Sequence, residues 1–174
     1  MVVIKSVLYA IFLKMKYYSK IRMNNYLGNK FYSLSRIYIH GKGKIQIGKM
    51  SLQTNAVLSS VGGILSIGEN VHINRNSCII CRDNIIIKDN VSIGPNVAIY
   101  DHDHCFGKNG KCSGFNCSQV VIGNNVWIGA GTIILRGTII GDNCVIGAGC
   151  VIKGTIPNNS IVKMQREISV EKLY

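Results

Sequence analysis

Isoleucine recurs at every sixth position in the last third of the chain. The six isoleucines are Ile122, Ile128, Ile134, Ile140, Ile146 and Ile152. The residue four places after each of them is small or β-branched, namely Val126, Thr132, Thr138, Cys144, Cys150 and Ile156. Helices repeat a face about every 3.6 residues and strands about every two, so a period of six fits neither. Six residues suffice for one short strand and a corner, and three such units close a triangular coil of about 18 residues. The pattern therefore predicts an all-β parallel solenoid.

The predicted solenoid stacks equivalent isoleucines on one another. The expected pairs are Ile122 with Ile140, Ile128 with Ile146, and Ile134 with Ile152. Successive coils lie about 4.8 Å apart, so the branched side chains fill a continuous interior. Four of the isoleucines are followed directly by glycine. We expect these glycines at corners where the backbone adopts unusual φ and ψ angles.

The repeat can be followed back towards the N-terminus, with two irregularities. It is first recognisable at Ile45, and the step between Ile79 and Ile87 is eight residues because a corner carries an insertion around residues 82–84. The pattern predicts about five coils over residues 45–157, followed by a tail over 158–174.

A longer interruption separates Ile99 from Ile122. Residues 100–119 contain two of the four histidines and three of the seven cysteines. Insertions in repeat proteins form loops on one face, which is often the working face. We therefore predict one protruding loop that carries the functional residues.

The first 44 residues differ in character from the rest. An apolar run ends at Leu13, and basic residues recur after it. The run is shorter than the roughly 20 residues that a spanning helix needs, and no signal-peptide cleavage site follows it. We predict a basic helical cap over the open end of the solenoid. A compatible second interpretation is peripheral contact with an anionic membrane, because Phe12, Tyr17 and Tyr18 lie among the bases as in an interfacial anchor.

The composition of the chain limits the kinds of partner and the cellular compartment that we expect. The chain of 174 residues fits one domain and has a formal net charge of +12, which calls for an anionic partner. The bases are not interleaved with aromatic residues as a nucleic-acid platform requires, so phosphate-bearing small molecules or an anionic membrane fit better. Seven cysteines are an odd number, and without a signal peptide they indicate a reducing, cytoplasmic compartment and no structural disulfides.

The sequence Asp101-His102-Asp103-His104 opens the interruption. A neutral imidazole, with an ordinary pKa of about 6.5, is suited to general-base catalysis at cytoplasmic pH, and a carboxylate can orient it. The alternative interpretation is that four polar residues simply begin a solvated loop. Either histidine is a candidate base.

Residues 91–104 and 122–131 resemble the bacterial sugar O-acetyltransferases of the hexapeptide-repeat family, and the resemblance extends over about residues 45–168. It implies a left-handed β-helix, although periodicity alone does not decide the hand. It also implies acetyl-CoA as co-substrate, a homotrimer with active sites between subunits, direct acetyl transfer and no metal.

The resemblance also implies roles for individual residues. His104 corresponds to the catalytic base, with His102 as the second candidate beside Asp103. Trp127 would line the channel for CoA, Gly129 would allow close approach, and the N–H of Ala130 would stabilise the oxyanion. The basic residues available near the last coils for CoA phosphates are Arg136, Lys153, Lys163 and Arg166. The residues expected to shape the acceptor pocket are Tyr100, Asp101, Phe106 and Phe115.

Several functions stay open from the sequence. The resemblance favours O-acetylation of a sugar hydroxyl in surface-polysaccharide biosynthesis, on a sugar, a nucleotide-sugar or a lipid-linked glycan at the inner face of the membrane. The first alternative is N-acetylation of an amino sugar or its nucleotide-linked form. A non-catalytic solenoid scaffold is another. A zinc site is the last, because the interruption contains enough nitrogen and sulfur ligands: His102, His104, Cys105, Cys112 and Cys117.

Overall fold

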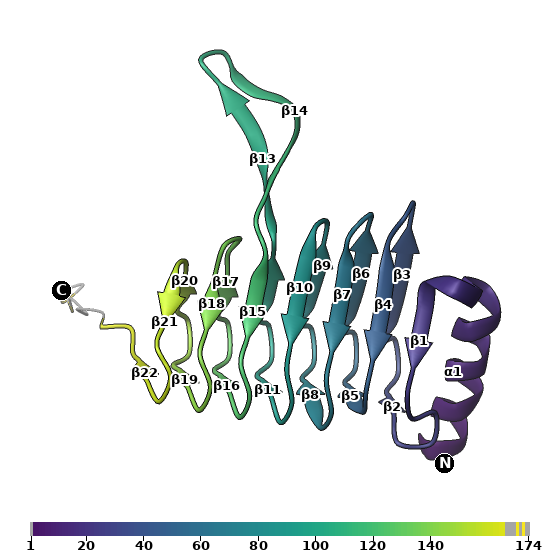
Figure 1. The fold of residues 1–174 in the computed structure, drawn as a ribbon. Helices are drawn as coiled ribbons and strands as arrows, with labels where there is room; N and C mark the ends of the chain where they lie inside the picture. The colour runs from purple at the N-terminus through teal and green to yellow at the C-terminus, as the bar shows by residue number, and fades with distance from the viewer. Residues whose placement is uncertain (1, 166–169, 171, 173–174) are drawn as a thin grey trace.

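The computed structural model describes residues 2–165, 170 and 172, and shows a parallel β-solenoid built from three sheets (Figure 1). The first sheet contains β1 (Ile21–Met23), β4 (Lys44–Ile47), β7 (Ile64–Ile67), β10 (Asn84–Ile87), β15 (Val120–Ile122), β18 (Ile139–Ile140) and β21 (Thr155–Ile156). The second contains β2 (Lys30–Phe31), β5 (Met50–Leu52), β8 (Val71–Ile73), β11 (Ser92–Ile93), β16 (Trp127–Ile128), β19 (Val145–Ile146) and β22 (Ile161–Val162). The third contains β3 (Arg36–His40), β6 (Val57–Val61), β9 (Cys78–Cys81), β12 (Ala98–Tyr100), β17 (Ile133–Ile134) and β20 (Val151–Ile152).

The strands visit the three sheets in rotation, so each turn adds one strand to each sheet. The three predicted isoleucine pairs are confirmed: Ile122 is in register with Ile140, Ile128 with Ile146, and Ile134 with Ile152. All six side chains are at most 5% exposed. The predicted parallel solenoid is therefore confirmed, whereas its left hand stays a prediction from the resemblance.

The solenoid begins earlier and ends later than the sequence predicts. Six complete turns precede β21 and β22, where about five were expected, and β1 to β3 lie within the segment expected to be a cap. Ile21 pairs with Ile45, a step of 24 residues, whereas Ile122 pairs with Ile140, a step of 18. The longer step of the first turn hid the six-residue period. At the other end, β22 extends the solenoid into the expected tail.

The corners use glycine and asparagine for different reasons. Left-handed backbone falls on asparagines, such as Asn125 and Asn143 with φ of 55° and 57°, and on glycines that do not follow the core isoleucines, such as Gly131 with φ of 67°. The glycines that follow the core isoleucines serve another purpose. A Cβ on Gly129 would lie 2.5 Å from the backbone nitrogen of Ala148 in the next turn. The expectation that these glycines supply unusual φ angles is therefore wrong, because close stacking of the turns is what excludes a side chain.

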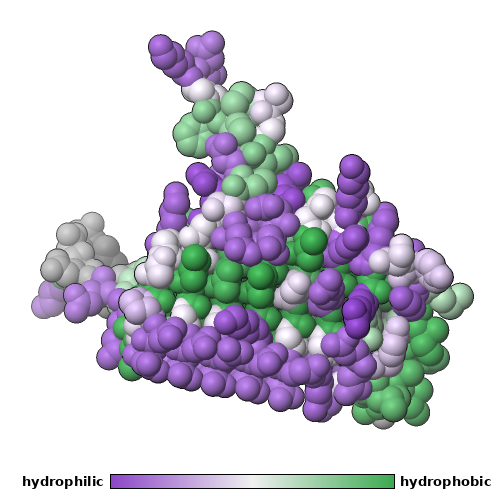
Figure 2. Space-filling view, in the orientation of Figure 1, coloured by the Kyte–Doolittle hydropathy of each residue, from purple (hydrophilic) through white to green (hydrophobic). Residues whose placement is uncertain are grey.

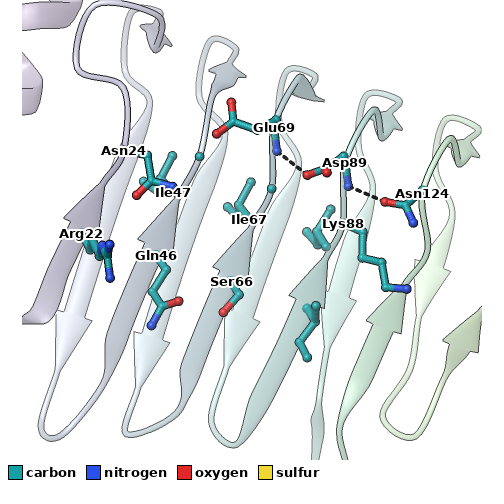
Figure 3. A pocket seen from close by; sticks show the side chains of 14 residues that line it. Arg22, Asn24, Gln46, Ile47, Ser66, Ile67, Glu69, Lys88, Asp89 and Asn124 are labelled. Atoms are coloured by element: carbon teal, nitrogen blue, oxygen red, sulfur yellow. Dashed lines mark hydrogen bonds between the residues drawn. The ribbon is translucent and has the colours of Figure 1, made fainter.

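Side chains at one corner link successive turns by hydrogen bonds. The N–H of Glu69 donates to Asp89, and the N–H of Asp89 donates to Asn124, at 2.7 and 3.2 Å (Figure 3). The series continues through Asp142, which accepts from the N–H of Asn124 at 2.7 Å. These bonds to backbone donors lower the pKa of the Asp142 carboxyl. The series fixes the register of the turns outside the apolar core.

A single helix closes the N-terminal end, as predicted. Helix α1 (Val2–Tyr17) lies across the end of the stack and is followed by a short 3-10 helix, η1 (Tyr18–Lys20). Ser6, Ala10 and Leu13 are the buried residues of α1. The Ser6 hydroxyl accepts from the N–H of Phe31 at 2.9 Å, so the helix satisfies a polar group on the first turn as well as covering its core.

The predicted protruding loop is an antiparallel hairpin that projects from the third sheet's edge of the solenoid (Figure 1). Its strands are β13 (His102–Gly107) and β14 (Gly110–Cys117). The register pairs His102 with Cys117 and His104 with Phe115. The hairpin therefore holds the two histidines on one short strand.

Truncation of a stacked core side chain should destabilise the solenoid. Ile128→Ala removes a side chain that is 0% exposed between Ile93 and Ile146, and we expect a loss of about 2–5 kcal/mol in the free energy of unfolding. The control Ile64→Ala changes a side chain that is 43% exposed and should cost less than about 1 kcal/mol. Denaturant titration measures both, and equal losses would contradict the stacked core.

Candidate active site

The root of the hairpin is fixed by a buried carboxylate. The Asp101 side chain is 0% exposed and accepts the backbone N–H groups of Arg82, at 2.9 and 3.0 Å, and of Asp83, at 2.8 Å. It also lies 3.0 Å from Nδ1 of His102. Because a buried carboxylate needs such partners, Asp101 locks the corner at residues 82–84 to the hairpin. The Asp101 side chain is buried, so in this structure it faces the hairpin root, and its contact with an acceptor stays a prediction.

His102 is oriented and partly covered. Its side chain is 13% exposed, Nδ1 faces the Asp101 carboxylate, and the ring meets the Phe115 ring edge-on with centroids 5.4 Å apart. The Tyr100 ring lies on another side at 6.0 Å. An Asp–His pair of this kind fixes one tautomer and leaves the second ring nitrogen to act as a base or an acceptor.

His104 is the exposed histidine of the hairpin. Its ring lies against Phe115 with centroids 4.6 Å apart, and among the described residues neither ring nitrogen has a hydrogen-bond partner. The Arg82 guanidinium also lies over the Phe115 ring, with its central carbon 3.5 Å from the ring centroid. Phe115 contacts both histidines and Arg82, and its expected place in the acceptor pocket stays a prediction.

An ion pair ties the middle of the hairpin to the solenoid. Nε of Arg136 donates to a carboxylate oxygen of Asp103 at 2.5 Å, with the two side chains 28% and 39% exposed. Arg136 was expected to bind CoA phosphate, and Asp103 was expected to assist the base. In this structure Arg136 and Asp103 pair with each other, and the ion pair positions the hairpin strand that carries His104.

The residues expected to receive the donor lie together on a corner of the second sheet. Trp127 is 58% exposed on the outer face of β16, Gly129 packs against the next turn, and its N–H donates to Ile146. The neighbouring N–H of Gly131 donates to Pro95. The N–H of Ala130 has no partner in the part of the chain that the structure describes. A free N–H at an exposed corner can stabilise a developing oxyanion.

The remaining candidates are dispersed. Lys153 and Lys163 are exposed near the last turns, and Arg166 lies outside the described residues. Phe106 is 76% exposed on β13, two residues after His104. Burial raises the pKa of the Tyr100 hydroxyl, so Tyr100 is neutral at pH 7 and can serve as a hydrogen-bond donor but not as a base.

Sequence reasoning missed the role of the corner insertion at residues 82–84. The eight-residue step marked it, but nothing in the repeat indicated that its N–H groups face Asp101 or that Arg82 covers Phe115. Burial, with Asp101 nearby, also raises the pKa of the Cys81 and Cys117 thiols. Both thiols are therefore protonated at neutral pH, which argues against either as an acyl-accepting nucleophile.

Other surface features do not coincide with this cluster. A shallow groove of about 510 Å³ runs along the first sheet and is lined by residues such as Arg22, Gln46 and Lys88 (Figure 3). No residue of the histidine cluster lines it. Within the described residues, no three His, Cys, Asp or Glu side chains form a group that could hold a metal ion.

Comparison with known proteins shows which proteins this solenoid is similar to. Residues 119–154 match the family model of bacterial transferase hexapeptide (six repeats). A galactoside acetyltransferase in complex with coenzyme A is 28% identical, with 81% of this chain and 58% of that chain covered and a TM-score of 0.54. A maltose O-acetyltransferase from Clostridium difficile 630 is 27% identical, with 91% and 81% covered and a TM-score of 0.50.

A third solved structure has the same fold. It is a variant of AntD, an N-acyltransferase from Bacillus cereus, in complex with dTDP and coenzyme A, at 20% identity, 94% and 89% coverage and a TM-score of 0.71. No curated protein matches the chain in sequence. Residues 119–154 therefore match hexapeptide repeats of bacterial transferases, and the solenoid is similar to acyltransferases of this fold.

Asp101→Asn should loosen the root of the hairpin. The amide keeps one acceptor oxygen but places an N–H₂ group against backbone donors, at a cost of about 1–3 kcal/mol. We expect the amide protons of Arg82 and Asp83 to exchange at least about tenfold faster, as measured by hydrogen exchange. Asp103→Asn is the control, because its carboxylate accepts from neither of these groups. Unchanged exchange in Asp101→Asn would show that the carboxylate does not anchor the hairpin.

Proposed function

We propose that this protein transfers the acetyl group of acetyl-CoA to a sugar hydroxyl. The observation that carries the proposal is the pair of imidazoles on β13, one anchored to a buried carboxylate and one exposed without a hydrogen-bond partner among the described residues. The acetyltransferases of this fold at 27–28% identity, one of them bound to coenzyme A, support the donor. The names of these two relatives give a galactoside and maltose as acceptors. We extend acetyl transfer to a sugar hydroxyl from them to this chain.

The reaction is a direct transfer with His104 as general base. A free ring nitrogen of His104 accepts the proton of the acceptor hydroxyl while the oxygen attacks the thioester carbonyl. The N–H of Ala130 donates to the oxyanion of the tetrahedral intermediate. Collapse of the intermediate breaks the C–S bond, and the departing thiolate takes the proton back from the imidazolium. No acyl-enzyme is formed, the acceptor proton ends on the CoA thiol, and the imidazole is neutral again.

His102 and the buried carboxylate support this arrangement. Asp101 orients His102, and His102 and His104 both contact Phe115, so the ring stack sets the direction of the exposed imidazole. His102 is the alternative base, because its second ring nitrogen is also available once Nδ1 faces Asp101. Variants of the two histidines separate these roles.

The site is completed by a second copy of the chain in a homotrimer. The hairpin projects away from the body of its own chain (Figure 1), so His104 is presented outward. Apolar side chains on the outer faces of the late turns give a neighbouring copy a surface to cover: Ile133, Ile139 and Val151 are 37%, 47% and 58% exposed. The exposed Lys153 and Lys163 would meet the CoA phosphates. We expect the reaction in the cytoplasm, where acetyl-CoA is available.

Thiol release from acetyl-CoA tests the proposal. The purified protein is assayed against sugars, nucleotide-sugars and lipid-linked glycans, and amino sugars are included to detect N-acetylation. His104→Ala should lower kcat about 10²–10⁴-fold, whereas His102→Ala should lower it less. His40→Ala is the control, because His40 is exposed on β3 near the other end of the solenoid.

Three results would change the assignment. Full activity in folded His104→Ala with loss in His102→Ala would make His102 the base. Full activity in both variants would overturn histidine catalysis. No thiol release with any acceptor, together with no binding of CoA, would favour the scaffold interpretation.

A further inference from the structure

The outer face of α1 is apolar, although no described residue covers it. The residues Ile4, Leu8, Ile11 and Met15 are 68%, 62%, 47% and 78% exposed. Their spacing of three and four residues places them on one stripe of the helix, opposite the buried Ser6, Ala10 and Leu13. The stripe forms an apolar surface at the α1 end of the molecule (Figure 2). A soluble capping helix would carry polar residues at these positions.

The same end of the molecule carries most of the net positive charge. Ten of the 20 lysine and arginine residues lie in the first 49 positions, and the first acidic residue is Glu69. Nine of these ten bases are exposed, and Lys14 is half-buried. None of the ten forms an ion pair with a described acidic residue. The rest of the chain contains ten bases and eight acids, so it is nearly neutral.

Lysines flank the apolar stripe on both sides. Lys5 and Lys16 lie on one side of the stripe and Lys14 on the other, by their positions on the helix. Nζ of Lys16 lies 5.9 Å from the centroid of the Phe12 ring, which is 53% exposed. An apolar stripe bordered by long basic side chains is suited to the boundary between acyl chains and anionic headgroups, where the ammonium groups reach the phosphates.

We propose that α1 and the basic first turns dock this protein onto an anionic lipid surface, with α1 lying in the plane of the interface. A spanning arrangement does not fit, since none of the helices in the described part of the chain has the length and apolarity to cross a bilayer, and the 16 residues of α1 extend only about 24 Å. In-plane docking buries the stripe and leaves the solenoid outside the lipid.

Charge decides between lipid and a second copy of the chain. An end-to-end dimer through α1 would bring two clusters of unpaired cations against each other and would repel. An anionic leaflet attracts the same cluster, and each base near the surface strengthens binding about fivefold. The described C-terminal strand β22 lies at the opposite end of the solenoid (Figure 1), so it does not cover the stripe.

Co-sedimentation with vesicles tests the docking. The full chain should sediment with vesicles of phosphatidylcholine containing about a third phosphatidylglycerol, and at least about tenfold less with phosphatidylcholine alone. Raising the salt from about 0.1 to about 1 M should weaken the binding, because screening shortens the reach of the charges. Lys5→Gln and Lys16→Gln should each weaken it about fivefold.

Leu8→Glu should lower binding to the anionic vesicles at least about tenfold, because it places a carboxylate in the stripe. Ile161→Glu is the matched control: Ile161 is 66% exposed, close to the 62% of Leu8, but lies at the other end of the solenoid. It should bind like the unmodified chain. Should Leu8→Glu lower the melting temperature, Met15→Glu serves instead, since Met15 is 78% exposed.

Two results would overturn the proposal. One is no binding of the unmodified chain to anionic vesicles, and the other is equal binding by the unmodified chain and Leu8→Glu. If Leu8→Glu instead halves the molecular mass in sedimentation velocity while no vesicle binding occurs, the stripe is a contact between copies. The assay measures lipid binding alone, so neither result bears on acetyl transfer.

Discussion

The register between successive turns is the constraint on which the rest of the structure depends. Each turn places its strands directly against those of the turn before, so backbone hydrogen bonds, isoleucine stacks and corner hydrogen bonds repeat along one axis. The turns approach so closely that a Cβ on Gly123 would lie 2.6 Å from the backbone of Gly141. A solenoid of this kind is held together by nearest-neighbour contacts, and its corners have fixed positions relative to one another.

The hairpin uses this rigidity at two points. At its root, Asp101 accepts hydrogen bonds from the N–H groups of the preceding turn and orients His102. Further out, Asp103 pairs with Arg136 of the following turn. The strand between these anchors carries His104, so a loop that interrupts the repeat is nevertheless held by the turns on both sides of it. A side chain on a strand that is held at two points keeps its orientation, as a catalytic group requires.

The regular part of the fold was predictable because six-residue periodicity directly reports strand and corner geometry. The isoleucine pairs and the protruding loop followed from counting. The turn formed by β1 to β3 escaped detection because its step differs from that of the regular turns, as the pairing of Ile21 with Ile45 shows. The roles of Arg82 and Asp101 could not be predicted, since they depend on which atoms face each other across a corner insertion, and periodicity says nothing about insertions.

We propose that His104 and Ala130 belong to one catalytic site that two copies of the chain share. Subunit mixing of His104→Ala with Ala130→Pro tests this most directly. Proline removes the N–H and fixes φ. The equivalent corner one turn earlier already holds a proline, because Pro95 follows Gly94 as Ala130 follows Gly129. Each variant alone should be inactive, whereas a random mixture should regain up to about a quarter of the unmodified activity, since sites with both intact residues re-form between copies. No recovery in stable mixed oligomers, or full activity of either variant alone, would contradict the account.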